Sequence, residues 1–162
     1  MRLEGSCHCG AVRFSCESLE PWPYQRCYCS ICRKTGGAGG YMINLGGDAT
    51  TLTVEGEAEL LVYRAMVERD GTTVRSGHRR YFCRHCGSHV YAIHDRWPAL
   101  VHPVASAIDS PLPAPPHLVH MMLGSKASWV PDEVGPDDEA YEAYPVASLA
   151  SWHREHGYED PR

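Results

Sequence analysis

The amino-acid sequence predicts a mainly β protein that forms one metal-binding domain over residues 1–162. Seven or eight short segments have the composition of strands, and only one longer segment, near the carboxyl end, has the pattern of a helix. Seven of the eight cysteines also fall in close groups. A chain of 162 residues can bury a hydrophobic core without cross-links, so the cysteines require an explanation other than stability.

The first half of the chain contains three segments that we expect to be strands. Residues 7–16 form the first, because Val12, Phe14 and Cys16 alternate with polar residues as in a half-buried strand. Residues 41–45 and 51–56 form the next two, and a turn at residues 46–48 separates them. In this pattern Cys16 is a small core residue rather than a ligand.

The middle of the chain predicts two hairpins. Residues 59–67 are expected to be strand, and Asp70-Gly71 is a turn signal that connects them to a strand at residues 72–75. Residues 80–82 and 88–93 flank Cys83 and Cys86, which places two cysteines at the tip of the second hairpin.

The last third combines two strands, a loop and a helix. Residues 99–104 and 117–123 are strand candidates joined by a stiff, proline-rich loop. Residues 132–142 carry six acidic residues and no basic one, which indicates a solvated loop. After Pro145, apolar residues recur at three-residue spacing at Val146, Leu149 and Trp152, which predicts a short C-terminal helix.

Two cysteine pairs have the spacing of half-sites for zinc. The CxxC pair of the second hairpin is followed by Gly87, and the CxC pair near the amino end is followed by Gly10. Glycine there can adopt the left-handed backbone that lets both sulfurs of a pair converge. The sequence therefore predicts one closed structural zinc site with four ligands: Cys7, Cys9, Cys83 and Cys86.

A third group supplies three thiolates within six residues: Cys27, Cys29 and Cys32. Catalytic zinc sites keep three protein ligands and leave the fourth position for water or substrate, so this group is the candidate active site. Recruitment of Cys16 as a fourth ligand would instead close the site. Disulfides are a further alternative, which a reducing compartment disfavours.

The charge balance excludes some functions. With 15 Lys and Arg against 20 Asp and Glu, the formal net charge is -5, which argues against general binding to nucleic acid or anionic membranes. The amino end lacks the apolar region of a signal peptide, and no segment approaches the roughly 18 apolar residues of a membrane span. We therefore expect a cytoplasmic protein with no nucleic-acid or membrane partner.

Four segments in chain order resemble the glutathione-dependent formaldehyde-activating enzyme family. They are GSCHCGAVRF at residues 5–14, CYCSICRK at 27–34, FCRHCGS at 82–88 and GSKASW at 124–129. The resemblance implies a β-tent fold of antiparallel sheets with zinc knuckles and two Zn²⁺ per chain. One zinc would be structural, on Cys7, Cys9, Cys83 and Cys86, and one catalytic, on Cys27, Cys29 and Cys32.

The resemblance also implies an activity. Members of the family join glutathione to formaldehyde as S-(hydroxymethyl)glutathione, a carbon-sulfur lyase reaction run in reverse. A zinc ion with three thiolates is a poor activator of carbonyls and is better suited to hold an incoming thiol as thiolate. The alternative is a zinc-stabilised β-tent module that binds a partner without catalysis, because a fold alone does not determine function.

Basic residues and glycines surround the cysteine triplet. Arg26, Arg33 and Lys34 could offset the negative charge of the thiolates, bind substrate carboxylates, or be ordinary surface residues. If residues 30–35 form a helical turn, two of the three cysteines lie at its start. The glycines of residues 36–40 could admit a substrate close to the backbone or simply form a turn into the next strand.

Overall fold

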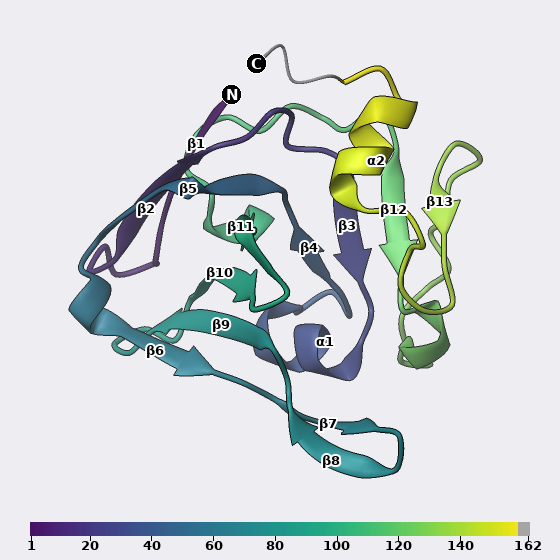
Figure 1. Ribbon diagram of the computed structural model, residues 1–162, viewed down its shortest axis with the longest axis horizontal. Coiled ribbons are helices and arrows are strands. Elements are labelled where there is room, and N and C mark those ends of the chain that lie inside the picture. Colours follow the sequence, from purple (N-terminus) through teal and green to yellow (C-terminus); the bar gives the residue numbers. More distant parts are fainter. Residues whose placement is uncertain (159–162) are drawn as a thin grey trace. The chain divides into compact units, whose positions relative to one another are not determined.

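The computed structural model describes residues 1–158, which divide into two compact units. The antiparallel unit comprises residues 2–17 and 47–111. The mixed-sheet unit comprises Met1 and residues 18–46 and 112–158. Each unit contains its own sheet (Figure 1) and one cysteine cluster. The prediction that residues 1–162 form a single domain stays a prediction.

The antiparallel unit is built on one sheet with strand order β1-β2-β5-β11-β10-β9-β6. All of its neighbouring strands are antiparallel. Its strands are β1 (Arg2–Ser6), β2 (Arg13–Glu17), β5 (Gly47–Glu55), β6 (Leu60–Tyr63), β9 (His78–Cys83), β10 (His89–His94) and β11 (Trp97–Pro103). Short 3-10 turns follow β5 and β11, at η1 (Glu57–Glu59) and η2 (Ala105–Ala107).

Residues from several strands of this sheet form the core of the unit. Leu3, Val90 and Val101 are fully buried, and the ring of Phe14 packs edge-on against Tyr91 with centroids 5.6 Å apart. Cys16 is 2% exposed in β2, which agrees with its predicted place in the core.

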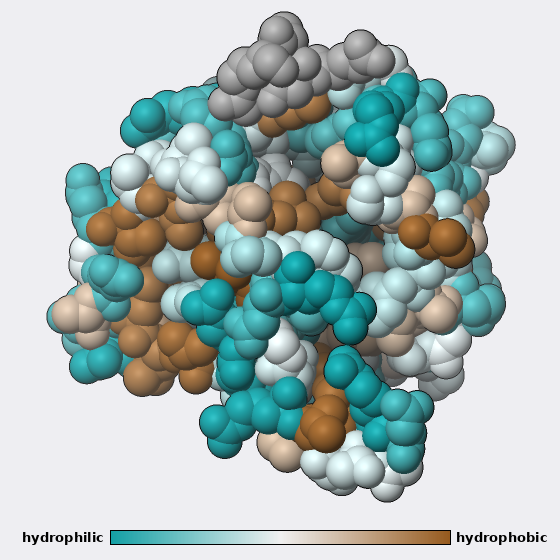
Figure 2. Space-filling view, viewed as in Figure 1, coloured by the Kyte–Doolittle hydropathy of each residue, from teal (hydrophilic) through white to brown (hydrophobic). Residues whose placement is uncertain are grey.

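A separate two-stranded hairpin, β7 (Met66–Arg69) and β8 (Thr72–Arg75), extends from the same unit. The predicted turn is confirmed, because Asp70 and Gly71 both have positive φ, at 50° and 72°. Two left-handed central residues match the right-handed twist of the strands that they connect. In the space-filling view, apolar side chains are visible at the surface in the region of β6 and this hairpin (Figure 2), where Leu61, Val62 and Met66 are exposed.

Two expectations for the first half of the chain are wrong. Residues 7–16 are not one strand, because Cys7 N–H donates to the Val12 carbonyl at 3.0 Å and closes a turn between β1 and β2. Residues 46–48 do not form the expected turn, since Gly47 begins β5. A Cβ on Gly47 would lie 2.8 Å from Cys16 Sγ, so this glycine permits close packing inside the sheet.

The mixed-sheet unit has strand order β13-β12-β3-β4. Strand β12 pairs in parallel with β13 and β3, whereas β3 and β4 are antiparallel. Strands β3 and β12 are about a hundred residues apart in sequence, and an irregular loop separates β12 from β13. Local sequence patterns therefore do not predict either parallel pair. Its elements are β3 (Tyr24–Cys27), α1 (Ser30–Gly36), β4 (Met42–Asn44), β12 (Leu118–Met121), η3 (Leu123–Ser125), β13 (Glu139–Ala140) and α2 (Leu149–Glu155).

The mainly β class and the short C-terminal helix are confirmed, with two corrections. Helix α2 starts later than expected, at a capping box of Ser148 and Ser151, and Val146 is 99% exposed outside it. The acidic segment is not wholly a solvated loop, because it contains β13 and the largely buried Asp138, whose side chain is 11% exposed.

Within residues 1–158, no helix is both long and apolar enough to cross a membrane.

Candidate metal centres

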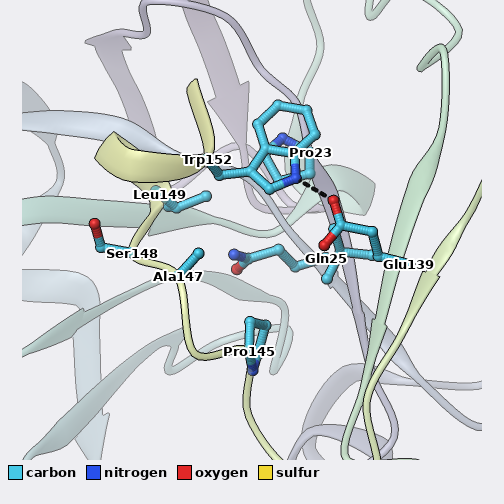
Figure 3. A pocket seen from close by; sticks show the side chains of 9 residues that line it. Pro23, Gln25, Glu139, Pro145, Ala147, Ser148, Leu149 and Trp152 are labelled. Carbon is cyan, nitrogen blue, oxygen red and sulfur yellow. Dashed lines mark hydrogen bonds between the residues drawn. The ribbon is translucent and has the colours of Figure 1, made fainter. Parts of the chain in front are cut away.

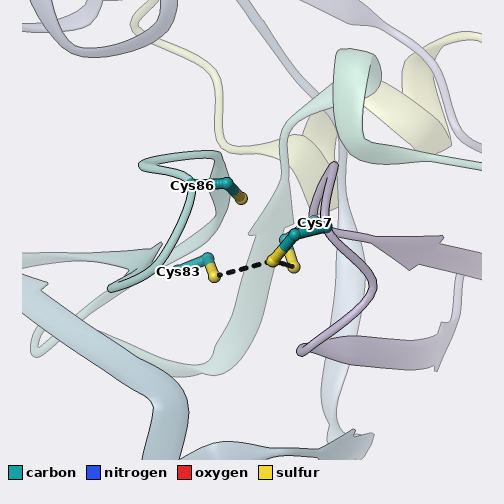
Figure 4. A group of neighbouring side chains, drawn as sticks. Cys7, Cys83 and Cys86 are labelled. Carbon is teal, nitrogen blue, oxygen red and sulfur yellow. Dashed lines mark hydrogen bonds between the residues drawn. The ribbon is translucent and has the colours of Figure 1, made fainter.

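The antiparallel unit brings together the four cysteines predicted to form the structural site. Their sulfurs all lie within 4.8 Å of one another. Cys7 and Cys9 come from the β1–β2 turn, whereas Cys83 ends β9 and Cys86 lies in the turn that follows it, as Figure 4 shows for the three labelled side chains. The sulfurs of Cys7 and Cys9 are 3.6 Å apart, and those of Cys9 and Cys83 are 3.7 Å apart.

These distances fit a tetrahedral zinc ion. With Zn–S bonds of about 2.3 Å, tetrahedral geometry separates the sulfurs by roughly 3.8 Å. A disulfide would instead require sulfurs about 2.05 Å apart. The Cys7–Cys9 and Cys9–Cys83 sulfur distances are too long for such a bond. The donor set is therefore suited to zinc or another thiophilic ion.

Glycines shape both turns of this cluster. Gly10 and Gly87 have φ values of 76° and 75°, the left-handed conformation that their positions after each cysteine pair predicted. In each turn, the glycine N–H donates to the carbonyl of the first cysteine of the pair, Cys7 or Cys83.

Ser88 links the two turns and was not singled out from the sequence. Its hydroxyl accepts the backbone N–H of His8 at 3.1 Å and lies 3.2 Å from Cys86 Sγ. The Ser88 hydroxyl, assisted by its backbone N–H, lowers the pKa of Cys86 to about 5, which favours the thiolate that a metal requires. In the sequence, Ser88 could have been identified by its position two residues after Cys86, the second cysteine of the CxxC pair.

The mixed-sheet unit brings together Cys27, Cys29 and Cys32, whose sulfurs also lie within 4.8 Å of one another. Cys27 ends β3 and Cys32 lies in the first turn of α1, which confirms the expected helical turn. Cys29 is the N-cap of this helix, and its sulfur accepts the backbone N–H of Cys32 at 3.3 Å. All three residues are buried, with exposures of 2%, 7% and 5%.

The thiols of this triplet interact strongly with one another. Contacts with Cys27 first and Cys32 second lower the pKa of Cys29, and the contact with Cys29 raises the pKa of Cys27. Negative charge is therefore stabilised on Cys29, and ionisation of the neighbouring Cys27 thiol is disfavoured. A bound cation would stabilise several thiolates at once. Among residues 1–158, no fourth Cys, His, Asp or Glu joins the cluster, so its donor set fits an ion with one position left open.

Cys16 belongs to neither cluster. It lies in β2, where burial raises the pKa of its thiol to about 11. The arrangement of four, three and one therefore describes the cysteines better than two groups of four.

Basic residues near the triplet have different environments. Arg26 is held against the protein, because its guanidinium lies 3.4 Å from the Glu133 carboxylate and 4.7 Å from the centroid of the Tyr41 ring. Arg33 is half-buried and Lys34 exposed on α1. Within the described part of the chain, neither of these two forms an ion pair with an acidic side chain.

The glycine-rich loop after α1 has a packing explanation. A Cβ on Gly37 would lie 2.4 Å from the Tyr41 carbonyl oxygen, and a Cβ on Gly40 would lie 2.1 Å from Val130 Cγ2. Gly40 also has a φ of 93°. These contacts favour the turn interpretation over close approach of a substrate.

A small pocket in the same unit lies beside α2 (Figure 3) and includes no cysteine of either cluster. Its one carboxylate, Glu139, accepts the indole N–H of Trp152, so the pocket presents no evident catalytic group. Its lining consists of Pro23, Gln25, Val119, Glu139, Pro145, Ala147, Ser148, Leu149 and Trp152.

Comparison with known proteins identifies the relatives of this chain. A family model described as "Glutathione-dependent formaldehyde-activating enzyme" matches residues 2–141. The chain belongs to this family. A formaldehyde-activating enzyme relative from Halomonas elongata, named "Putative glutathione-dependent formaldehyde-activating enzyme", is 54% identical over 160 residues, which are 99% of each chain. The resemblance of the four sequence segments is thereby confirmed.

A solved structure supports the fold of this member of the formaldehyde-activating enzyme family. A Rhodobacter sphaeroides protein from the Northeast Structural Genomics effort has a TM-score of 0.52 and 26% sequence identity. The match covers 70% of this chain and 92% of that chain.

Proposed function

We propose that the protein is a zinc-dependent enzyme of the carbon-sulfur lyase type, which adds a thiol such as glutathione reversibly to a small aldehyde such as formaldehyde. The observation that supports this most directly is the buried triplet of Cys27, Cys29 and Cys32, which offers three sulfurs and no fourth ligand within residues 1–158. Family membership and the name of the Halomonas relative support the same substrates.

The two clusters have different roles in this proposal, which assigns two zinc ions to each chain. The four-cysteine cluster, with a complete ligand set, would hold a structural ion. The triplet would hold the catalytic ion, which when bound supplies a position where a thiol is kept deprotonated at neutral pH. Cysteines clustered with the spacing of metal ligands also favour a reducing cytoplasm as the site of action.

The residues of the triplet position the reacting groups. Cys29 caps α1 and contacts the backbone N–H of Cys32, so the helix start fixes two of the three sulfurs relative to each other. The substrate thiolate attacks the aldehyde carbon, a carbon-sulfur bond forms, and the resulting alkoxide takes a proton from solvent or a nearby acid. The triplet residues are at most 7% exposed, so the reacting groups would lie in a site largely shielded from solvent.

Basic residues on β3 and α1, beside the triplet, would bind the carboxylates of glutathione. Arg33 and Lys34 are the stronger candidates, because Arg26 already contacts Glu133 and Tyr41. Binding of a carboxylate by Arg26 would require it to exchange the Glu133 contact for the substrate. All three assignments as substrate-binding residues are part of the proposal.

The activity can be tested by NMR exchange between ¹³C-formaldehyde, glutathione and their adduct. The zinc-loaded protein should accelerate exchange above the spontaneous rate, and Cys32→Ser should abolish the acceleration. Cys16→Ser is the matched control, because it alters a buried cysteine outside both clusters. Zinc at both clusters without any acceleration would reject the proposed chemistry and favour a zinc-stabilised binding module.

A further inference from the structure

A buried chain of polar side chains connects the triplet to the acidic segment. Tyr28, which lies between Cys27 and Cys29, has its hydroxyl 2.9 Å from Nδ1 of His120. Nε2 of His120 is 3.1 Å from Oδ2 of Asp138. Tyr28 is 1% exposed and His120 is completely buried. None of these three side chains is a ligand in either cysteine cluster.

The hydrogen bonds of Asp138 determine the direction of this chain. Its carboxylate accepts the backbone N–H groups of Leu118 at 2.7 Å and Gly135 at 2.8 Å. An ionised carboxylate only accepts hydrogen bonds, so Nε2 of His120 carries the hydrogen that points to it. In the neutral imidazole, Nδ1 is then the acceptor, and the Tyr28 hydroxyl donates to it.

The backbone ties Tyr28 to the same strand as His120. Strand β12 pairs in parallel with β3, and Tyr28 N–H donates to the Met121 carbonyl at 3.0 Å. The Tyr28 ring also packs against Tyr41, with centroids 5.2 Å apart. Tyr28 is therefore held at its backbone, its ring and its hydroxyl, although it leaves the regular strand at Cys27.

The contacts that hold Tyr28 in place also restrict the positions of the two cysteines next to it in sequence. Cys27 and Cys29 flank it directly, so a rotation or shift of Tyr28 changes the separation of two of the three sulfurs. A fully satisfied buried polar network specifies one geometry, whereas packing alone tolerates small shifts.

We propose that Tyr28, His120 and Asp138 are positioning residues, and that their hydrogen-bond chain fixes the geometry with which the triplet binds its ion. This inference rests on the proposed function only for the presence of a metal at Cys27, Cys29 and Cys32. It assigns the acidic segment a role through Asp138, about 110 residues away in sequence from the triplet.

Cobalt(II) titration tests the inference, because thiolate-bound cobalt has absorption bands that report its geometry. Tyr28→Phe removes only the hydroxyl, and Asp138→Asn keeps the size of the side chain. Both should weaken cobalt binding at the triplet by roughly 10–100-fold and alter its bands. The bands and affinity of the four-cysteine cluster should stay unchanged, which provides an internal check that the variants are folded.

Val119→Ala is the matched control, since Val119 is buried next to His120 on β12 but is not part of the chain of hydrogen bonds. It should leave the cobalt bands and affinity of the triplet as in the wild type. Wild-type bands and affinity in both Tyr28→Phe and Asp138→Asn would overturn the inference. Wild-type cobalt binding at the triplet without thiol–aldehyde exchange would reject the proposed function alone.

Nitrogen-15 NMR of the imidazole gives a second measurement that does not require the variants to bind metal. In the zinc-loaded wild type, His120 should be the tautomer with hydrogen on Nε2. In Asp138→Asn, the side-chain amide can donate to Nε2, so the hydrogen should move to Nδ1. Hydrogen on Nδ1 of neutral His120 in the wild type would contradict the direction of the chain and overturn the proposal.

Discussion

At the scale of single residues, cysteines of the same chemistry have different roles because their surroundings differ. Cys29 accepts a backbone N–H at a helix start, and Cys86 lies beside the Ser88 hydroxyl. Burial, and after it the negative charge of nearby carboxylates, raises the pKa of the Cys16 thiol. The environment thus favours the thiolate at Cys29 and Cys86 and the neutral thiol at Cys16.

Substitution of the core cysteine should separate stability from metal binding. Cys16→Ser replaces a buried thiol with a more strongly polar hydroxyl, and we expect a loss of about 1–3 kcal/mol in the free energy of unfolding. Zinc content per chain should not change. Urea unfolding and metal analysis measure the two quantities, and loss of zinc from this variant would show that Cys16 is a ligand after all.

His89 should contribute to the pH dependence of stability. Burial, assisted by the charge of Arg80, lowers the pKa of His89 to about 4. Between pH 6.5 and 4 the unfolded chain therefore binds more protons at this residue than the folded chain, so stability falls as the pH decreases. The shift corresponds to roughly 3 kcal/mol at its full extent.

His89→Asn removes this titration. The difference in unfolding free energy between wild type and variant should change across pH 6.5 to 4, with the wild type losing more stability on acidification. Urea unfolding at several pH values measures this difference. Parallel curves over that range would contradict the assignment of a neutral, buried His89.

At the scale of elements, turns decide where the ligands lie. The β1–β2 and β9–β10 turns each present a cysteine pair, and the start of α1 presents two members of the triplet. The turn positions of Gly10 and Gly87 were predictable because local backbone geometry imposes them. The strand boundaries around Cys7 and Gly47 were not predictable from the sequence. At Cys7, the apolar alternation continues through a turn. At Gly47, a glycine required for close packing has the same sequence signal as a glycine in a turn.

The loop between α1 and β4 allows a matched pair of substitutions. Gly40→Ala introduces a Cβ at positive φ and 2.1 Å from Val130 Cγ2, so it should cost more than about 1 kcal/mol of stability. Gly39→Ala is the control, because the nearest atoms to its Cβ are 4.0 Å away in the Tyr41 ring. Thermal or urea unfolding compares the two, and equal stabilities would contradict the packing explanation for Gly40.

At the scale of the whole molecule, each compact unit contains one cysteine cluster. A structural zinc site contributes about 10–16 kcal/mol of binding free energy in small zinc domains, which is comparable to the total stability of a domain. Metal binding and folding of each unit should therefore be coupled.

Removal of one ligand should affect one unit selectively. The wild type should contain two zinc ions per chain, and Cys27→Ala and Cys83→Ala should each contain one. Hydrogen exchange should increase in the mixed-sheet unit for Cys27→Ala and in the antiparallel unit for Cys83→Ala, and a chelator should increase it in both. A single zinc ion in the wild type would refute the two-site arrangement.

The sequence by itself determined the mainly β class, the three cysteine groups and the family, because these depend on spacings within a few residues. Only the tertiary structure decided the parallel pairing of β12 with β3 and the support of Tyr28 by His120 and Asp138. Side chains distant in sequence meet through the pairing of nonadjacent strands, which no local pattern encodes. The acidic segment, residues 132–142, illustrates the difference, because its composition predicted a solvated loop. In the structure, burial and three hydrogen bonds distinguish Asp138 from the other residues of this segment.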